Sequence, residues 1–382
     1  MKRVLSIAAI SVVVLLVILF ILVVPLGPAV VRAFHVEPVC ITGQLPNLRV
    51  VSCGTGKAGS PAPTPRPSSG IRPVIVDTDM APDDWMAILY LLQRSDLDVK
   101  AITVAGTGEA HCAQGVQNAL KLAALAGKPA IPVACGRDTP LQGNRAFPDA
   151  WRDWADGLAG LSLPAGQQAA SGGAVELLRA TIAGLPGKVA IVALGPLTNL
   201  AEAFTADASL ASRVDMVYIV GGAFRVPGNV GMSGFGIQNQ AAEWNMYVDP
   251  HAAALTLRSG APITFVPLDA TNQVPLTKAF YDRMTRDHAA PAATFVYQVL
   301  GKLSDRIGSG PYWFWDPLTA AICADESLAT YTEQRVAVSE EEGPSVGATR
   351  FADSGARARI VVKVSRATFE NQFLTVLNGR SP

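Results

Sequence analysis

Hydrophobic and polar positions alternate along the chain with two different periods. Short runs rich in Val and Ile are separated by longer segments rich in Ala and Leu, in which apolar positions recur at helical spacing. The short runs predict strands over 73–76, 99–105, 131–134, 189–194, 214–220 and 263–267. The longer segments predict helices over 84–93, 113–125, 174–183, 197–204 and 250–258. Alternation of this kind is typical of βαβ units, so we expect an α/β fold with a mostly parallel, doubly wound sheet flanked by helices.

The alternation loosens beyond residue 331. Two further runs, 335–339 and 358–364, predict strands added to this sheet. An amphipathic segment over 367–377 predicts the last helix.

The N-terminus differs from the rest of the chain. Lys2 and Arg3 precede a run from Val4 to Val24 without a charged residue, and these 21 residues at about 1.5 Å each are long enough to cross a bilayer. We expect residues 1–30 to be a signal anchor, with the rest of the chain outside the cytoplasm. The alternative is a long signal peptide cleaved near Gly27, which would release a secreted protein.

A linker follows this anchor. Residues 54–71 are dominated by Pro, Gly and Ser, a composition typical of semi-extended linkers. We therefore divide the chain into the anchor, an extracytoplasmic segment with linker over 31–71, and a domain over 72–382.

Composition excludes some functions. The chain has 382 residues and a formal net charge of zero, so nothing in it indicates a nucleic-acid partner. Cys40 and Cys53 are candidates for a disulfide in an oxidising compartment. Cys112, Cys135 and Cys323 lie among apolar or small residues, and we expect them to be buried free thiols.

The first predicted strand is followed by four carboxylates, Asp77, Asp79, Asp83 and Asp84. Ligands of open α/β sheets bind beyond the carboxyl ends of the strands, where these side chains fall. Because like carboxylates repel one another and charges are costly to bury, the cluster favours a site for a hard cation such as Ca²⁺ or Mg²⁺. The alternative is an acidic surface loop that caps the next helix.

Five segments in this order resemble the inosine-uridine preferring nucleoside hydrolases, from about residue 72 to residue 377. The segments are Asp77-Thr78-Asp79-Met80-Ala81-Pro82-Asp83-Asp84, Gly195-Pro196-Leu197-Thr198-Asn199, Gly221-Gly222 followed by Gly228-Asn229, Ala242-Glu243-Trp244-Asn245 leading to Asp249-Pro250, and Trp315-Asp316-Pro317. The resemblance implies Ca²⁺-dependent hydrolysis of the N-glycosidic bond of ribonucleosides.

The resemblance also implies a metal site. Asp79, Asp84, Asp316 and the backbone carbonyl of Leu194 would bind Ca²⁺, and Asp79 would also act as the general base on a bound water molecule. Asp77 would support these ligands from behind.

The ribose contacts follow in the same way. Asp83, Asn229, Glu243 and Asn245 would bind the ribose hydroxyls. Glu243 and Asn245 have a structural alternative, the capping of the helix after Pro250. Thr198 and Asn199 are interpreted as a turn, and Asp249 and Pro250 as the N-cap and first residue of a helix.

The chain departs from the family pattern in three places. A glycine-rich insertion lies between Asn229 and Glu243, which makes Asn239 a competitor of Asn229 for the ribose. This insertion is either a mobile lid or a longer surface loop. In the loop after the second strand, Glu109 or His111 is a candidate to contact ribose or to donate a proton to the leaving base.

The third departure is Trp315, which stands where many pyrimidine-accepting members carry a His. Trp-Asp resembles the purine-specific branch, so we expect Trp315 to stack on a purine base and assist its departure. Core packing is the alternative role. Two further functions stay open: a non-catalytic Ca²⁺-dependent nucleoside-binding protein, and a hydrolase of another N-ribosyl compound. We also expect a possible homo-oligomer, as in many family members.

Overall fold

The computed structural model describes residues 70–167, 169–307 and 312–382. The predicted anchor and the pair Cys40 and Cys53 lie outside the described residues, as does the linker up to residue 69. Within residues 70–382, apart from the gaps just given, no helix is long and apolar enough to cross a membrane.

The described residues form a nine-stranded sheet with the order β3-β2-β1-β4-β5-β6-β9-β7-β8. All neighbouring pairs from β3 to β9 are parallel, whereas β7 pairs antiparallel with both β9 and β8. The strands are β1 (Arg72–Thr78), β2 (Leu97–Val104), β3 (Val133–Cys135), β4 (Val189–Ala193), β5 (Val214–Val220), β6 (Ile263–Val266), β7 (Ala329–Val338), β8 (Thr349–Phe351) and β9 (Ala356–Val364). The mostly parallel α/β sheet expected from the sequence is confirmed.

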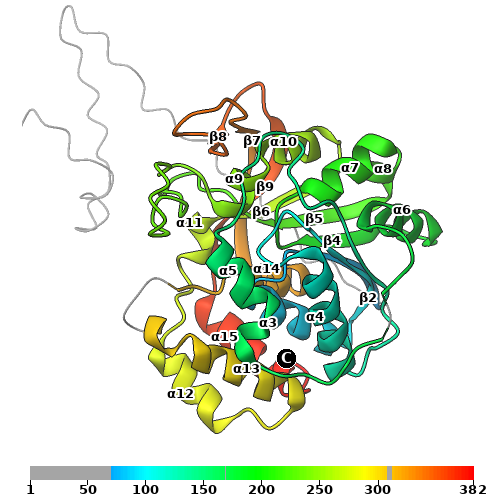
Figure 1. Cartoon of the computed structure of the whole chain (residues 1–382), viewed down its shortest axis with the longest axis vertical. Helices are drawn as coiled ribbons and strands as arrows, with labels where there is room; N and C mark the ends of the chain where they lie inside the picture. The colour runs from blue at the N-terminus through cyan, green and yellow to red at the C-terminus, as the bar shows by residue number, and fades with distance from the viewer. Residues whose placement is uncertain (1–69, 168, 308–311) are drawn as a thin grey trace, which may run out of the picture. The chain divides into compact units, whose positions relative to one another are not determined.

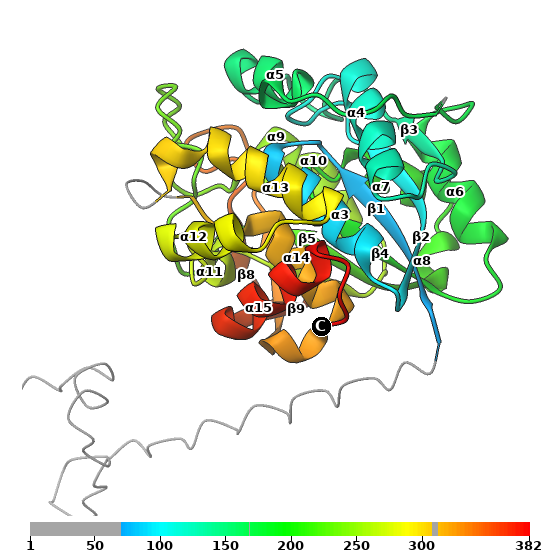
Figure 2. The same cartoon turned by 90° about the horizontal axis from the view of Figure 1, so that it is seen from below.

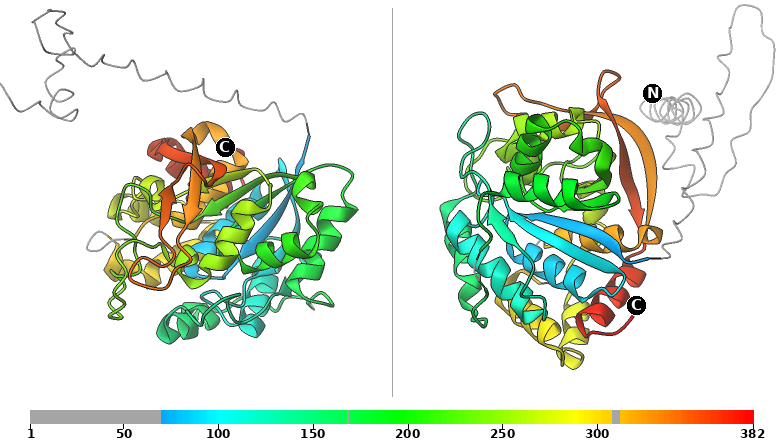
Figure 3. Two further views of the ribbon diagram at one scale, coloured as in Figure 1. Left: turned by 90° about the horizontal axis from the view of Figure 1, so that it is seen from above. Right: turned by 90° about the vertical axis from the view of Figure 1, so that its right-hand side faces the viewer.

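Helices cover both faces of this sheet (Figures 1 and 3). One face carries α6 (Ala174–Gly184), α7 (Thr198–Ala206), α8 (Leu210–Arg213) and α10 (Pro250–Arg258). The other carries α3 (Pro82–Gln93), α4 (Cys112–Leu125), α13 (Pro291–Lys302), α14 (Trp315–Ala324) and α15 (Arg366–Leu377). Figure 2 shows α13 and α15 together on this second face. Further helices are α5 (Asp149–Asp156), α9 (Trp244–Val248), α11 (Leu268–Thr271) and α12 (Lys278–Arg286).

The side chains of β1 alternate between the two faces of the sheet, and each face has its own hydrophobic core. Val74 and Val76 pack into the core on the α3 side, whereas Ile75 packs into the core on the α7 side. Successive side chains of a strand point to opposite faces, so a strand buried on both faces is a continuous apolar run. β1 is therefore an interior strand, and its carboxyl end lies between those of β2 and β4.

Several elements differ from the prediction. The chain between β6 and α14 forms α12 and α13, which the pattern did not predict. The helix α5 was not predicted either. α12 is strongly polar and buries only Phe280 and Met284, so it offers little hydrophobic signal. The strand predicted at 335–339 is longer, because it begins at Ala329 and pairs along β9.

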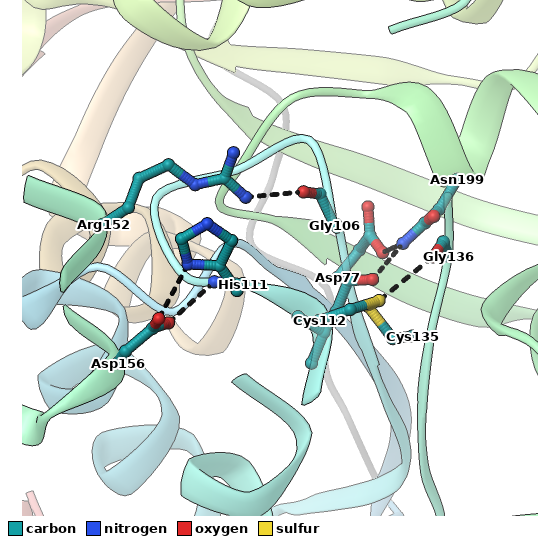
Figure 4. Close-up of a disulfide and its surroundings, with 10 residues drawn as sticks. Asp77, Gly106, His111, Cys112, Cys135, Gly136, Arg152, Asp156 and Asn199 are labelled. Carbon is teal, nitrogen blue, oxygen red and sulfur yellow. Dashed lines mark hydrogen bonds and ion pairs between the residues drawn. A yellow bond between two sulfur atoms is a disulfide. The ribbon is translucent and has the colours of Figure 1, made fainter. Parts of the chain in front are cut away.

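The prediction of three free thiols in this domain is wrong for two of them. Cys112 and Cys135 form a disulfide, with their Cα atoms 5.7 Å apart (Figure 4). Cys112 is the first residue of α4 and Cys135 the last of β3, and the register of β3 on β2 brings these two ends together. Cys323 is buried and unpaired among the described residues, as expected.

Candidate active site

The turn between β1 and α3 presents the acidic cluster. Met80 has a φ of 63°, a conformation that is uncommon for residues other than glycine. Its carbonyl accepts a hydrogen bond of 2.7 Å from Trp85 Nε1, and its N–H donates to Thr78 Oγ1 at 3.1 Å. These contacts hold the chain in a sharp turn, so that α3 begins at Pro82 with two acidic residues in its first turn. Local strain of this kind is common at functional sites.

Two neighbouring loops pack directly on Asp79. A Cβ atom placed on Gly195 would lie 2.5 Å from Asp79 Cβ, and one placed on Gly108 would lie 2.0 Å from it. Both positions therefore require glycine for close approach. The loops after β1, β2 and β4 meet at this carboxylate, which is 2% exposed.

Three carboxylates form a compact group. Asp83, Asp84 and Asp316 each place one oxygen within 4.8 Å of the others. Asp83 and Asp84 come from the first turn of α3, and Asp316 comes from the first turn of α14. Asp84 Oδ1 accepts hydrogen bonds from Thr78 Oγ1 and from the Asp79 N–H. Asp84 Oδ2 is buried and has no hydrogen-bond partner among the described residues.

The electrostatics of this group favour a cation. Burial, and then repulsion from Asp84, raises the pKa of Asp83 to about 8. Burial is also the main reason why the pKa values of Asp79 and Asp316 lie well above the usual range, followed by repulsion from Asp84 and Asp83 respectively. Buried carboxylates at this density need protons or a cation to offset their repulsion. An all-oxygen donor set with an unpartnered oxygen fits a hard divalent cation.

Asp77 lies behind this group and is fully buried. Its Oδ1 accepts a hydrogen bond of 2.5 Å from Thr103 Oγ1. It also accepts one of 2.8 Å from Asn199 Nδ2 (Figure 4). Burial raises the pKa of Asp77 to about 7, although both hydrogen bonds lower it. Asn199 therefore joins the start of α7 to the end of β1.

The motif around Glu243 lines the same cavity as the first turn of α3. Glu243 is the N-cap of α9, and its carboxylate accepts hydrogen bonds from the N–H groups of Asn245, Met246 and Gly222. Glu243 therefore caps a helix, as its structural alternative predicted. The helix that it caps is α9, however, and not the one after Pro250. Asp249 caps that second helix through the Ala252 N–H, as predicted.

Asn245 connects two strand ends. Its Nδ2 donates to the Leu194 carbonyl at 3.1 Å and to the Val220 carbonyl at 3.3 Å. A carbonyl oxygen has two lone pairs, so Leu194 retains one for another partner. The Leu194 N–H in turn donates to the Asp77 carbonyl at 2.8 Å, which fixes this loop on β1.

These side chains surround one cavity of about 750 Å³. Most of the residues proposed from the sequence line it: Asp79, Asp83, Asp84, Glu109, Leu194, Asn229, Glu243, Asn245, Trp315 and Asp316. They come from the carboxyl edge of the sheet, where an open α/β sheet binds its ligands.

Two proposed residues do not line this cavity. His111 is half exposed, and its Nδ1 lies 2.7 Å from Asp156 Oδ2 (Figure 4). Asn239 is buried in a loop, where its Nδ2 donates to the Val346 carbonyl and its Oδ1 accepts from Ala241 and Ala242. The structure therefore gives His111 a hydrogen bond to Asp156 at the surface and Asn239 a role in loop structure, and neither lines the cavity.

Other lining residues were not proposed from the sequence. Lys302 and Arg306, at and beyond the end of α13, bring two cations to the cavity, and Tyr312 brings a phenol. Trp154 reaches it from α5. The helices α5 and α13, which carry or lead to Trp154, Lys302 and Arg306, were not predicted, so the sequence offered no signal for the position of these side chains.

Trp315 is the first residue of α14 and lines the cavity. Its ring lies 4.8 Å from that of Tyr312 and 5.7 Å from that of Trp313, measured between centroids. Its indole Nε1 is buried without a hydrogen-bond partner among the described residues. Trp315 therefore belongs to an aromatic cluster beside Asp316, and it both packs and contacts the cavity.

Comparison with known proteins gives one consistent family. The sequence model of the family described as "Inosine-uridine preferring nucleoside hydrolase" matches residues 74–371. Uridine nucleosidase 1 of Arabidopsis thaliana is 40% identical over 205 residues, which cover 53% of this chain and 58% of that protein. The pyrimidine-specific ribonucleoside hydrolase RihA of Salmonella paratyphi C is 32% identical over 272 residues, which cover 70% of this chain and 84% of that protein.

The fold comparison agrees. A solved plant nucleoside hydrolase superposes with a TM-score of 0.72 at 31% identity, covering 81% of this chain and 99% of that one. The chain thus aligns with less than two thirds of the Arabidopsis relative's length but with nearly the whole of the plant structure.

Proposed function

The chain belongs to the inosine-uridine preferring nucleoside hydrolase family, and from this premise we propose that it hydrolyses the N-glycosidic bond of ribonucleosides. Water would form a bond to C1′ of the ribose, the bond from C1′ to the base nitrogen would break, and the base would leave with the electron pair. The observation that carries the proposal is the buried group of Asp83, Asp84 and Asp316 beside Asp79 in a large cavity.

The proposed cation is Ca²⁺. The Asp79, Asp84 and Asp316 carboxylates and the Leu194 carbonyl would hold it, with Asp83 beside them, and these oxygen donors suit Ca²⁺ because it accepts many oxygen ligands in flexible geometry. When bound, the cation would orient the ribose hydroxyls and make the attacking water more acidic.

The protein's own groups would perform the remaining steps. Asp79 would take the proton of the attacking water as general base. Asp83 and the Asn245 side chain, which both line the cavity, would position the ribose. Trp315 would stack against the leaving base and exclude water from it.

Base preference separates two candidates. We propose a preference for purine nucleosides, supported by the aromatic groups Trp154, Tyr312, Trp313 and Trp315 in the cavity lining, since a larger base gains more from stacking. The second candidate is a pyrimidine preference, favoured by the names of the two relatives, one a uridine nucleosidase and the other pyrimidine-specific.

Release of ribose from inosine, guanosine, adenosine and uridine by the purified protein with Ca²⁺ tests both points. The proposal predicts turnover, with a higher kcat/KM for the purine nucleosides. A higher kcat/KM for uridine would support the pyrimidine candidate. Nucleoside binding without any turnover would contradict the hydrolase and favour the binding protein.

We also propose that the catalytic domain lies outside the cytoplasm, anchored by the apolar run from Val4 to Val24. The Cys112–Cys135 disulfide supports this location, because disulfides persist mainly in oxidising compartments. The test is labelling of intact cells with a membrane-impermeant thiol reagent before and after reduction. Labelling of Cys112 and Cys135 in intact cells after reduction is the expected result, whereas labelling only after lysis would contradict the proposal.

A further inference from the structure

An apolar wall borders the cavity beside Asn229 and Glu243. This wall consists of four aromatic side chains and one thioether, Phe147, Trp151, Met232, Phe235 and Trp244. They come from the segment before α5, from α5 itself, from the glycine-rich insertion and from the start of α9. A catalytic site that only had to hold a sugar hydroxyl would not need so large an apolar surface.

The rings of the wall pack on one another. Trp151 is central, with its ring centroid 5.3 Å from Trp244 and 5.5 Å from Phe235, both in edge-to-face arrangements. Phe147 stacks on Trp244 at 5.1 Å. Edge-to-face and stacked pairs of this kind are favourable, so the wall is a formed surface and not a set of separate side chains.

The insertion contributes the part of the wall that is most exposed. Met232 and Phe235 are 57% and 47% exposed, although both line the cavity. Large apolar side chains left in water at the rim of a cavity gain free energy when an apolar group of a ligand covers them. The insertion therefore offers a solvent-exposed apolar surface at this end of the cavity.

The proposed function, on which this inference rests, identifies the part of the substrate that faces the wall. The acidic group on α3 and α14 would take the 2′ and 3′ hydroxyls, and the remaining hydroxyl of ribose is on C5′. Asn229 and Glu243 were assigned to ribose hydroxyls in general, and we place them at the C5′ hydroxyl. Trp244 of the wall adjoins them, because its N–H donates to Asn229 Oδ1 at 3.1 Å. The wall thus lies at the 5′ end of the nucleoside.

The acceptor atoms of Glu243 and Asn229 at this end do not depend on a 5′ hydroxyl. The Glu243 carboxylate already accepts three backbone N–H groups, and the Asn229 oxygen accepts one. Replacing the hydroxyl by an apolar group would leave none of these atoms newly unpaired, so the usual cost of a lost hydrogen bond is small here. Ser233 Oγ, in the same lining, is buried without a partner among the described residues and is free to donate to a weak acceptor.

We propose that the apolar wall is a subsite for ribonucleosides with an apolar substituent on C5′, such as a 5′-alkylthio group. The thioether sulfur would lie near Ser233, and its alkyl group would cover Met232 and Phe235. The reaction is unchanged: water adds to C1′, the base departs, and the C5′ substituent stays on the sugar. The insertion, which distinguishes this chain from the family pattern, thereby determines substrate choice.

The first test compares kcat/KM for inosine and uridine with kcat/KM for their 5′-deoxy-5′-methylthio analogues. The expected result is a value for each analogue at or above that of its parent. In Phe235→Ala or Met232→Ala the ratio of analogue to parent falls about tenfold, the scale of burying one or two methyl-sized groups. Phe351→Ala is the control, because Phe351 is also partly exposed but lies outside the cavity lining; it leaves the ratio unchanged.

A lower kcat/KM for the analogues than for the parents would overturn the subsite and leave the hydrolase proposal intact. So would a ratio that is unaffected by Phe235→Ala and Met232→Ala. If no nucleoside is hydrolysed, the hydrolase proposal has failed, and the subsite is then tested by measuring ligand binding. The probes are then two unreactive sugars, methyl β-ribofuranoside and its 5-deoxy-5-methylthio analogue, measured by calorimetry. About tenfold tighter binding of the analogue supports the subsite, whereas equal or weaker binding contradicts it.

Discussion

Asn199 Nδ2 lies 2.8 Å from Asp77 Oδ1, although 122 positions separate the two residues. The same amide donates to the Val104 carbonyl at 3.1 Å. One side chain at the start of α7 therefore ties together the carboxyl ends of β1 and β2. Since Asp79 follows two residues after Asp77, this bond positions the proposed general base without touching the substrate.

Replacing Asn199 by Ala tests this positioning role. Loss of both hydrogen bonds leaves Asp77 with a single partner, so the β1–α3 turn loosens. We expect kcat and Ca²⁺ affinity to fall by about 10- to 100-fold, the usual effect of removing a group that orients metal ligands. Steady-state kinetics and Ca²⁺ titration measure the two quantities.

A matched control is available in α10. Thr256 is buried, and its Oγ1 has no hydrogen-bond partner among the described residues. Thr256→Val removes a buried polar atom of no known function and should leave kcat and Ca²⁺ affinity close to wild type. Equal effects of Thr256→Val and Asn199→Ala would show that general destabilisation, and not positioning, explains the loss.

Metal removal should destabilise the protein. The repulsion among Asp83, Asp84 and Asp316 is offset when a cation binds the folded state, so Ca²⁺ should raise the melting temperature in a concentration-dependent way. In Asp316→Asn that rise should be much smaller, while the variant's melting temperature without Ca²⁺ should equal or exceed that of wild type. Differential scanning calorimetry with a chelator and with added Ca²⁺ makes the comparison. The substitution Asp207→Asn, at the surface, serves as the control.

The contribution of Trp315 should depend on the base. Trp315→Ala removes an aromatic surface from the cavity, so kcat/KM should fall about tenfold for inosine and less for uridine, because the larger purine loses more stacking. The ratio of the two losses is an internal control against misfolding. Equal losses on both substrates would assign Trp315 to packing alone.

Stability in acid should depend on Glu326, which lies at the opposite end of the sheet. Burial raises the pKa of Glu326, but its hydrogen bonds with Arg359 and Tyr218, each 2.6 Å, outweigh that effect and the pKa is lowered. A carboxyl group whose pKa is lowered in the folded state stabilises the protein at pH values above its unfolded-state pKa. This stabilisation is lost as the pH falls through the folded-state pKa.

Glu326→Gln should therefore cost about 1–3 kcal/mol of unfolding free energy at pH 7, the scale of a hydrogen bond to a charged group. The cost should shrink as the pH falls below the unfolded-state pKa of about 4.3 and on through the lowered folded-state pKa, because the ionised carboxylate is then lost. Urea unfolding at several pH values measures this, with the exposed Glu341→Gln as control. A cost that stays constant from pH 7 to pH 3 would argue against the ionised carboxylate as its source.

The sheet and the acidic group were predictable because their signals are local. A buried apolar strand, a turn and an acidic helix start follow one another within residues 73–84, and each obeys short-range rules. Glu243 and Asp249 were likewise recognised as possible helix caps, although the short helix α9 was not predicted, and so the first cap was placed on the wrong helix.

Features that depend on long-range packing were not predictable. The Cys112–Cys135 disulfide joins residues 23 apart whose proximity depends on how β3 pairs with β2. The position of His111 depends on Asp156 in α5, a helix that was not predicted. Lys302 and Arg306 reach the cavity only because α13 packs on α3, which no local pattern in either segment indicates.

The most direct test of the account is the rate of ribose release from inosine and uridine by wild type and by Asp79→Asn, both saturated with Ca²⁺. Removal of a positioned general base typically costs between 10²- and 10⁴-fold. We predict Ca²⁺-dependent turnover by wild type and a loss of about 10³-fold in Asp79→Asn, with the fold retained by circular dichroism. Turnover by Asp79→Asn at the wild-type rate would contradict the assignment of Asp79 as the base, and no turnover by folded, Ca²⁺-bound wild type would contradict hydrolysis itself.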